Sequence, residues 1–535
     1  MKIEILDTTL RDGAQGAGVE FSSDDKLRVI HELDLLGVSY IEAGMITSAA
    51  DVGFFSHLGE VQKQLENAKL CVFCRTVKAG ERAEDDELLT LCAAAPVPAA
   101  VIYGKASLSQ LTDVLGVTAE ENLRMIGESI SCLAKSGKEV IFDAEHFFDG
   151  YSDNPTYATD VVDTAFSSGA SKVILCDTNG GMLPDVIGLI TRAMREKYKN
   201  IGIHCHNDMG MAVSCSLSAV LEGAMQVHGT IMGVGERCGN ADLCTLIPIL
   251  QLKMGFDCIG ERIKNLTRVA RSITDAANLT FDEKSPFIGG YAFTHKAGAH
   301  IDGVKKSPRS FEHISPESVG NSRNIVISGL SGRAALLDKL RAYMPDENFT
   351  KEDPRVVRLM ASLKERESLG YDYEDSGASF ALLIDDAFGN RREFFRLLSL
   401  KVMTDEADDT YESKDGGGKE FHSSAVIKIS VGGREELTAG EGNGPVNAID
   451  EALRRALIHF YPEVGKMRLT DYRVRVLESR ATASRVRVAI ESTDGAKVWR
   501  TVGVSSDVIN ASWQALRDSV EYMLSDNFIA LKNIQ

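Results

Sequence analysis

Short apolar runs recur at intervals along the first part of the chain. Each is only a few residues long and rich in Val, Ile and other residues that favour β-structure. Eight such runs occupy residues 3–6, 39–42, 70–73, 100–103, 140–143, 172–176, 201–205 and 227–231. The pattern therefore predicts eight short strands.

Between these runs, apolar residues recur at helical spacing. Examples are residues 24–36, 119–134, 185–196 and 212–221, each bounded by Gly, Pro, Ser or Asn, which start or end helices. Strand and helix alternate eight times, which is the count of a TIM barrel. We therefore predict an α/β fold class, with a catalytic (β/α)8 barrel over residues 1–260.

Polar residues with useful chemistry follow the predicted strands. In a barrel all of these positions lie at the C-terminal face, where barrel enzymes carry their active sites. They are Arg11, Asp12, Arg75, Glu145, Thr178, His204, His206 and the loop 233–240. Their shared location supports the barrel prediction and indicates where the site should be.

The chain beyond the barrel is predicted to hold two further regions. Residues 261–388 are mainly helical, with an irregular stretch at 282–324, and predict helical linker subdomains. Within the last region, 389–535, an acidic and glycine-containing stretch at 404–419 predicts a loop.

The last region carries an internal repeat. Strand-like runs precede a helix twice, at 425–439 before 446–460 and at 472–504 before 510–524. The sequence Thr438-Ala-Gly in the first half is echoed by Thr501-Val-Gly in the second. We therefore predict an α+β domain of two similar βββα halves.

Composition limits the partners and the compartment. The 535 residues include 59 Lys+Arg and 77 Asp+Glu, and this net charge of −18 repels nucleic acid. The ten cysteines fall at irregular spacing and make a poor disulfide framework. The N-terminal residues contain no secretory signal pattern, and no apolar run is long enough to span a bilayer. We expect a cytoplasmic protein without a membrane segment.

Two histidines suggest a metal site. His204 and His206 are two apart on a predicted strand, so both point to the same side, and Asp12 would lie on the same face. An isolated His-x-His pair is more often two hydrogen-bonded residues at a strand end. A His, His, carboxylate set with open positions suits Mn²⁺, Mg²⁺, Co²⁺ or Zn²⁺ and can polarise a carbonyl substrate.

The neighbouring residues leave alternatives open. Arg11 can stabilise an oxyanion or simply pair with Asp12. Glu145 is either a partner of Arg11 or of a metal ligand, or a general acid/base. His295 and His300, in HKAGAH, are structural or include a base, and Cys238 is expected to be a packed small residue rather than a nucleophile.

These motifs resemble a known superfamily. DTTLRDG (7–13), HCHND (204–208) and GERCGNADL (235–243), in this order, resemble the DRE-TIM metallolyases, in the condensing branch of isopropylmalate, homocitrate and citramalate synthases. The likeness runs through the whole chain. FDAEHFFDGY, LCDTNGG, FEHISPESVG and EGNGPVNAIDEALR look most like the citramalate synthase subgroup.

The resemblance implies a role for each matching residue. It implies a Claisen-type condensation of acetyl-CoA with a 2-oxo acid, pyruvate in this subgroup, assisted by a divalent metal ion. The implied metal ligands are Asp12, His204 and His206, with Asn240 on or near the metal. Arg11 would stabilise the enolate or alkoxide, Thr178 would hold the 2-oxo acid carboxylate and Gln15 would line the site. Glu145 and His300 are the implied acid/base candidates.

The resemblance also implies regulation and assembly. Its members are homodimers whose C-terminal domain binds a branched-chain amino acid, isoleucine or leucine. Phe311 stands where the family often has Tyr, which removes any hydroxyl role there. The alternatives are a 2-isopropylmalate synthase that uses 2-oxoisovalerate, a carbon–carbon lyase, and a metal-binding effector sensor without catalysis. Arg75 leaves room for a substrate with a distal carboxylate.

Overall fold

The computed structural model of the chain describes two units. The described residues are 2–47, 51–296, 298–325, 336–337, 340–341, 343–344, 347–405, 422–477, 484–495 and 497–525. The first unit comprises Met1–Thr294 and Glu312–Asn324, and the second His295–Phe311 and Ile325–Gln535. Of the predicted acidic loop at 404–419, only residues 404 and 405 lie within the described residues.

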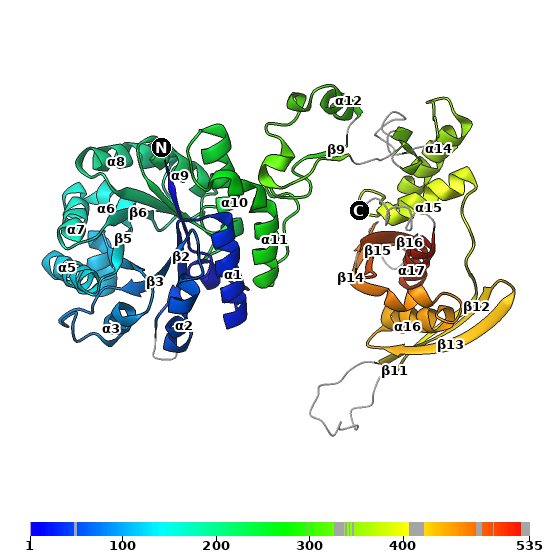
Figure 1. Cartoon of the computed structure of the whole chain (residues 1–535), viewed down its shortest axis with the longest axis horizontal. Coiled ribbons are helices and arrows are strands. Elements are labelled where there is room, and N and C mark those ends of the chain that lie inside the picture. Colours follow the sequence, from blue (N-terminus) through cyan, green and yellow to red (C-terminus); the bar gives the residue numbers. More distant parts are fainter. Residues whose placement is uncertain are drawn as a thin grey trace, which may run out of the picture. The chain divides into compact units, whose positions relative to one another are not determined.

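A closed parallel barrel of eight strands forms the first unit, in the order β1 to β8 (Figure 1). Parallel pairing of β8 with β1 closes it, with Leu6 opposite His228. The strands are β1 (Glu4–Asp7), β2 (Tyr40–Met45), β3 (Lys69–Arg75), β4 (Ala99–Lys105), β5 (Glu139–Glu145), β6 (Lys172–Asp177), β7 (Ile201–Cys205) and β8 (Gln226–Gly229). The predicted barrel is confirmed. Only β8 ends two residues early, because the chain enters a short 3-10 turn at Ile231–Gly233, in which Met232 has a left-handed φ of 61°.

Helices surround the barrel where the helical spacing predicted them. Ser22 and Asp25 form a capping box at the start of α1, and Gly37, at φ 88°, ends it. The barrel unit has α1 (Ser23–Leu36), α2 (Val52–Gln62), α3 (Glu87–Ala94), α4 (Leu108–Gln110), α5 (Ala119–Lys135), α6 (Phe147–Asp153), α7 (Pro155–Ser167), α8 (Pro184–Lys197), α9 (Ala212–Leu221), α10 (Leu243–Pro248) and α11 (Leu266–Ala276). On α11, Arg268 pairs with Glu32 of α1, so the helix packs on the barrel although it follows residue 260.

Side chains fill the barrel interior in layers. Apolar residues such as Leu6, Val101 and Ile141 form the middle. Below them, Glu139 accepts hydrogen bonds from Tyr40 and from Lys172, which closes the N-terminal end with a partly buried polar network. Polar residues lie above the apolar layer, at the C-terminal ends of the strands. The interior is therefore closed at one end and chemically functional at the other.

The second unit contains the predicted repeat. Two antiparallel sheets, β11-β12-β13 and β14-β15-β16, are each followed by a helix. Their elements are β11 (Arg396–Asp405), β12 (His422–Val431), β13 (Arg434–Gly442), α16 (Pro445–Leu457), β14 (Arg468–Val476), β15 (Val486–Thr493), β16 (Val498–Ser505) and α17 (Val508–Leu524). Helices α12 (Gly298–Lys306), α14 (Pro354–Ser368) and α15 (Gly377–Phe388) precede them. The α+β domain with its βββα repeat is confirmed.

The Thr-x-Gly echo has a structural cause. Thr438 Oγ1 donates to the Ala452 carbonyl of α16, and Thr501 Oγ1 donates to the Ala515 carbonyl of α17, each at 2.8 Å. A Cβ at Gly440 would lie 2.5 Å from the Ala452 nitrogen, so only glycine lets the strand approach its helix this closely. The same strand-to-helix contact is thus built in both halves.

The cysteines are all free thiols. All ten lie within the described residues, and none forms a disulfide. Cys238, however, is exposed rather than packed. The expectation of a packed Cys238 is wrong because the residue lies in a turn between two left-handed residues, Arg237 (φ 55°) and Gly239 (φ 86°). In the part of the chain that the structure describes, no helix is long and apolar enough to cross a membrane.

Candidate active site

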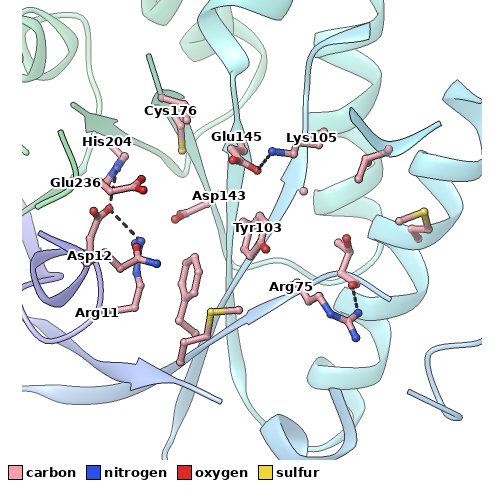
Figure 2. A pocket seen from close by; sticks show the side chains of 18 of the residues that line it. Arg11, Asp12, Arg75, Tyr103, Lys105, Asp143, Glu145, Cys176, His204 and Glu236 are labelled. Atoms are coloured by element: carbon pink, nitrogen blue, oxygen red, sulfur yellow. Dashed lines mark hydrogen bonds and ion pairs between the residues drawn. The ribbon is translucent and has the colours of Figure 1, made fainter. Parts of the chain in front are cut away.

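A cavity of about 450 Å³ opens at the C-terminal ends of the barrel strands. The structure brings most of the predicted site residues together around it (Figure 2). The predicted residues that line it are Arg11, Asp12, Gln15, Arg75, Glu145, Thr178, His204 and His206. Five different strand ends therefore supply one site.

Asp12, His204 and His206 form a compact set of potential metal ligands. The Nε2 atoms of His204 and His206 lie 3.6 and 3.8 Å from Asp12 Oδ2. These distances are close to the separation of two ligands that each lie about 2.1 Å from a shared cation. His204 is the second-last residue of β7, and His206, just beyond the end of the strand, lies on the same face and forms a bridge with Asn240.

The hydrogen bonding around this set fits a bound divalent cation. The three side chains are only 2, 5 and 7% exposed. The Nδ1 atoms of both histidines and Oδ1 of Asn240 are buried and have no hydrogen-bond partner among the described residues. Asn240 uses its amide nitrogen, which donates to the Val234 carbonyl and hydrogen-bonds Asp12, so its Oδ1 is the atom left without a partner. Two imidazoles, a carboxylate and an amide oxygen suit a borderline or hard cation.

The charges at the site favour cation binding. Burial opposes ionisation of Asp12, but Arg11 and the two histidines outweigh it and hold the pKa of Asp12 below its ordinary value. Burial, with the neighbouring His206, lowers the pKa of His204 to about 3. At neutral pH the site therefore offers a carboxylate and a neutral imidazole, the forms that ligate metal.

Arg11 is held by a partner that the sequence analysis missed. Its Nε donates to Glu42 Oε2 at 2.6 Å, its Nη1 donates to Asp12 Oδ2 at 3.0 Å, and its guanidinium lies 3.9 Å above the ring centre of Phe73. Glu42 is fully buried on β2. Its signal in the sequence was a single acidic residue inside the apolar run YIEAGM.

Glu145 does not pair with Arg11, so that alternative is wrong. Its Oε2 instead lies 2.7 Å from the Nζ of Lys105. The barrel register causes this pairing, because Lys105 and Glu145 are opposite each other at the ends of β4 and β5. Both side chains remain partly exposed to the cavity, which leaves Glu145 accessible to a substrate.

The remaining predicted residues occupy the rim. Thr178 Oγ1 accepts a hydrogen bond from the His146 backbone at 2.8 Å. Arg75 pairs with buried Asp86 at 2.8 Å. This ion pair neutralises the charge of Arg75, which the sequence had left open as a binding partner for a distal substrate carboxylate.

The loop after β8 is packed against a predicted metal-site residue. Gly235 in this loop has a φ of 154° and lies against Asn240, where an added Cβ would be 2.1 Å from Nδ2.

His300 and Phe311 lie in the second unit. The exposed His300 ring stacks on Phe311, with ring centres 4.1 Å apart. The Phe311 ring therefore packs against His300, a contact that needs no hydroxyl group. Participation of His300 in the barrel site stays a prediction.

Comparison with protein families divides the chain into three matches. Residues 2–280 match the HMGL-like family, which covers the whole barrel. Residues 287–367 match the homocitrate synthase post-HMGL domain, and residues 376–524 match the LeuA allosteric (dimerisation) domain. The last match covers both βββα halves.

Full-length relatives agree with these matches. The (R)-citramalate synthase of Aquifex aeolicus is 45% identical, over 98% of both chains. The (R)-citramalate synthase of Geobacter sulfurreducens is 41% identical, over 98% of this chain and 97% of its own. Among solved structures, the HMG-CoA lyase of Bacillus subtilis, 18% identical, covers 54% of this chain and 97% of its own with a TM-score of 0.46. The chain therefore belongs to the HMGL-like family and, within it, to the group of the (R)-citramalate synthases.

Proposed function

We propose that this chain is an acyltransferase that condenses acetyl-CoA with pyruvate, with the help of a divalent cation, and releases citramalate and CoA. The observation that carries this proposal is the convergence of Asp12, His204 and His206 beside Arg11 in the barrel cavity. The choice of substrates is supported by an (R)-citramalate synthase that is 45% identical and aligns over 98% of both chains. The native cation is Mn²⁺, Mg²⁺, Co²⁺ or Zn²⁺, all of which accept this donor set.

The side chains around the cavity divide the work. Asp12, His204 and His206 would hold the cation, with Asn240 beside it; when bound, the cation polarises the ketone of the 2-oxo acid. Thr178 and Gln15 line the space for the acceptor, where the Thr178 hydroxyl donates to the acceptor's carboxylate. Arg11, fixed by Glu42, offers its remaining N–H groups to the negative oxygen that develops during the reaction.

Proton removal from the acetyl methyl group falls to Glu145. Its carboxylate faces the cavity, and the ion pair with Lys105 orients it there, as a general base requires. The resulting carbanion attacks the ketone carbon, and water then cleaves the thioester. His300 is the second acid/base candidate.

The second unit is proposed to regulate this reaction. Its βββα repeat matches an allosteric and dimerisation domain, which supports a homodimer controlled by a branched-chain amino acid end product, isoleucine or leucine. A cavity of about 530 Å³ at the start of α16, lined by Asn447, Asp450, Arg454 and Tyr472, offers polar groups for such an amino acid, with Asp450 and Arg454 paired with each other at 2.7 Å. This function fits a cytoplasmic enzyme of branched-chain amino acid biosynthesis.

The decisive experiment measures release of free CoA thiol from acetyl-CoA in the presence of Mn²⁺ or Mg²⁺. Pyruvate, 2-oxoisovalerate, 2-oxobutyrate and 2-oxoglutarate are compared, each with and without isoleucine or leucine. Preference for pyruvate supports the proposal. Preference for 2-oxoisovalerate would make the chain a 2-isopropylmalate synthase, and release with none of them would favour a lyase or a sensor.

A further inference from the structure

Three buried polar side chains converge inside the barrel, next to the potential metal ligands. Glu42 on β2, Asp143 on β5 and His228 on β8 are 0, 4 and 0% exposed, and their ligating atoms all lie within 4.8 Å of one another. His228 Nδ1 is 3.9 Å from Asp143 Oδ1, and the His228 ring lies edge-on to that of His204 at 5.9 Å. The proposed reaction has no role yet for Asp143 or His228.

The hydrogen bonds around His228 fix its tautomer. Gln226 Nε2 donates to Glu4 Oε2, so the Gln226 amide is oriented with its oxygen toward His228. That oxygen lies 3.2 Å from His228 Nε2 and can only accept, which means that Nε2 carries the proton. Burial lowers the pKa of His228 well below its ordinary value, so the ring is neutral and Nδ1 is an acceptor.

Three acceptor atoms of this cluster receive no hydrogen bond from any described residue. Glu42 uses Oε2 to accept from Arg11, but Oε1 has no partner among the described residues. Asp143 Oδ1 and His228 Nδ1 are also buried and without a partner there. Three acceptors that face one another in a low-dielectric interior are unfavourable unless at least one of them carries a proton.

Asp143 is the group that best carries this proton. Burial raises the pKa of both carboxyls, but Glu42 is paired with the Arg11 guanidinium at 2.6 Å, which opposes that rise, whereas Asp143 has no Lys or Arg at ion-pair distance among the described residues. Burial, reinforced by the negative charge of Glu42, raises the pKa of Asp143 well above its ordinary value. The charged or titratable groups that act on it from the surrounding strands and loops are Arg11, Asp12, Glu42, Glu145, Cys176 and His228.

Asp143 also has access to the substrate space. It lines the same cavity as Arg11, His204 and Glu145. Figure 2 shows its carboxyl group between Asp12 and His204 on one side and Glu145 on the other. A proton on Asp143 is therefore available to a molecule bound between the predicted metal ligands and the predicted base.

We propose that Asp143 is a catalytic acid, which donates its proton to the oxygen of the 2-oxo acid as the new carbon–carbon bond forms. This inference rests on the proposed condensation. Glu145 takes one proton from the acetyl methyl group, and the carbanion electron pair forms the bond to the ketone carbon. The C=O π electrons move to oxygen, which receives the Asp143 proton and becomes the tertiary hydroxyl. When the product leaves, Glu145 releases its proton to solvent and the Asp143 carboxylate takes one from solvent, so the protons balance and neither oxidant nor reductant is needed.

The first test detects the proton without any turnover. The infrared carbonyl band of a protonated carboxyl is measured in the wild-type chain and in Asp143→Asn, which keeps the shape of the side chain. We expect the wild type at pH 7 to show a band that the variant lacks and that Glu521→Gln retains. Glu521 is a matched control, because burial raises the pKa of this carboxyl as well, in the second unit. A difference spectrum without a protonated-carboxyl band would overturn the proposal.

The second test separates the acid from the base. Asp143→Asn should lower kcat for condensation about 10²- to 10⁴-fold, the usual contribution of a general acid, while Glu521→Gln stays within about 2-fold. Exchange of acetyl-CoA methyl hydrogens with deuterated water, which requires only the base, should persist in Asp143→Asn. The fall in kcat of the wild type at alkaline pH should be absent in this variant.

Each outcome separates this inference from the proposed function. A wild-type chain that shows the infrared band but condenses none of the four 2-oxo acids would overturn the proposed function and the catalytic role together, while keeping the proton assignment. An active wild type whose Asp143→Asn variant keeps its kcat would overturn only the role of Asp143. Calorimetric titration with Mn²⁺ adds a third check: a second bound ion per chain that Asp143→Asn loses would identify the cluster as a metal site instead.

Discussion

The Nε atom of Arg11 lies 2.6 Å from Oε2 of Glu42, a residue on the neighbouring strand. The same guanidinium donates from Nη1 to Asp12, and Phe73 lies against its face. Arg11 is thereby fixed in position before any substrate arrives. A preorganised cation stabilises developing negative charge without the cost of reorganisation during the reaction.

Replacement of Glu42 by Gln should therefore disable Arg11. The amide keeps the volume of the side chain but removes the charge that holds the guanidinium, so we expect kcat to fall about 10²-fold, the typical loss when one oxyanion contact fails. Steady-state kinetics with acetyl-CoA and pyruvate measure this. Glu312→Gln is the matched control, because Glu312 is also a buried carboxylate paired with an arginine. It accepts hydrogen bonds from Nε and Nη2 of Arg323. Equal losses in the two variants would argue against a specific role for Glu42.

Gly235 should be essential for cation binding. An alanine Cβ at this position would lie 2.1 Å from Asn240 Nδ2 and 3.4 Å from Asp12 Oδ1, and the φ of 154° disfavours any side chain. We expect Gly235→Ala to weaken Mn²⁺ binding at least about 10-fold, as observed when groups that support metal ligands are disturbed. Calorimetric titration measures the affinity. Gly18→Ala is the control, because its φ is also positive but no atom lies within 4 Å of the added Cβ; the idea fails if both variants bind Mn²⁺ like the wild type.

Lys105 is expected to position the proposed base. Lys105→Met removes the partner that lies 2.7 Å from Glu145, and the carboxylate then loses its fixed orientation toward the cavity. We expect kcat to fall about 10-fold or more, with recovery in Lys105→Arg, which can form the same ion pair. The deuterium exchange of acetyl-CoA reports the base step directly. Unchanged exchange in Lys105→Met would assign the ion pair to packing alone.

Glu139 should make the barrel sensitive to acid. Burial opposes its ionisation, but hydrogen bonds from Lys172, Lys69 and Tyr40 lower its pKa to about 2 from the ordinary value of 4.5. Because the folded-state pKa is lower, this stabilisation is complete above pH 4.5 and is lost as the pH falls toward 2. Partial exposure limits it to about 1–2 kcal/mol.

Denaturant unfolding of Glu139→Gln and of the wild type checks this prediction. The variant should be less stable at pH 7, and the difference should shrink as the pH is lowered from 5 to 3. Glu60→Gln serves as the control, because Glu60 pairs with Lys63 on an exposed helix face where an ion pair contributes little. A difference in stability that is independent of pH would show that Glu139 acts through its packing and not through its charge.

Local periodicity accounts for much of what was predicted. The apolar spacing of residues 212–221 predicted both ends of α9, because its helical pattern stops at Glu222 and Gly223. The spacing of His204 and His206 predicted their common direction, since side chains two apart on a strand share a face. These relationships depend on residues close in sequence.

Contacts between distant residues were beyond this reasoning. The sequence left open that Glu145 pairs with Arg11. In the structure, the strand register instead places Glu145 against Lys105 and Arg11 against Glu42. Asp143 stands two residues before Glu145 in the motif FDAEHFFDG, yet nothing in its neighbours in sequence indicates that Glu42 and His228 face it. The C-terminal end of the barrel unit shows the same limit, since α11 is assigned to the barrel by its ion pairs with α1.

The sequence alone determined the barrel, the repeat, the family and the predicted set of Asp12, His204 and His206, because each rests on periodicity or on motifs of adjacent residues. The tertiary structure alone decided which charges pair and which are left without partners. Closure of the eight strands fixes their register, and the register sets the height of each interior side chain along the barrel axis. Arg11 therefore pairs with Glu42, and Lys105 pairs with Glu145. Burial of Glu42 and Asp143 at one end of the barrel then raises the pKa of both carboxyls, which no single strand encodes.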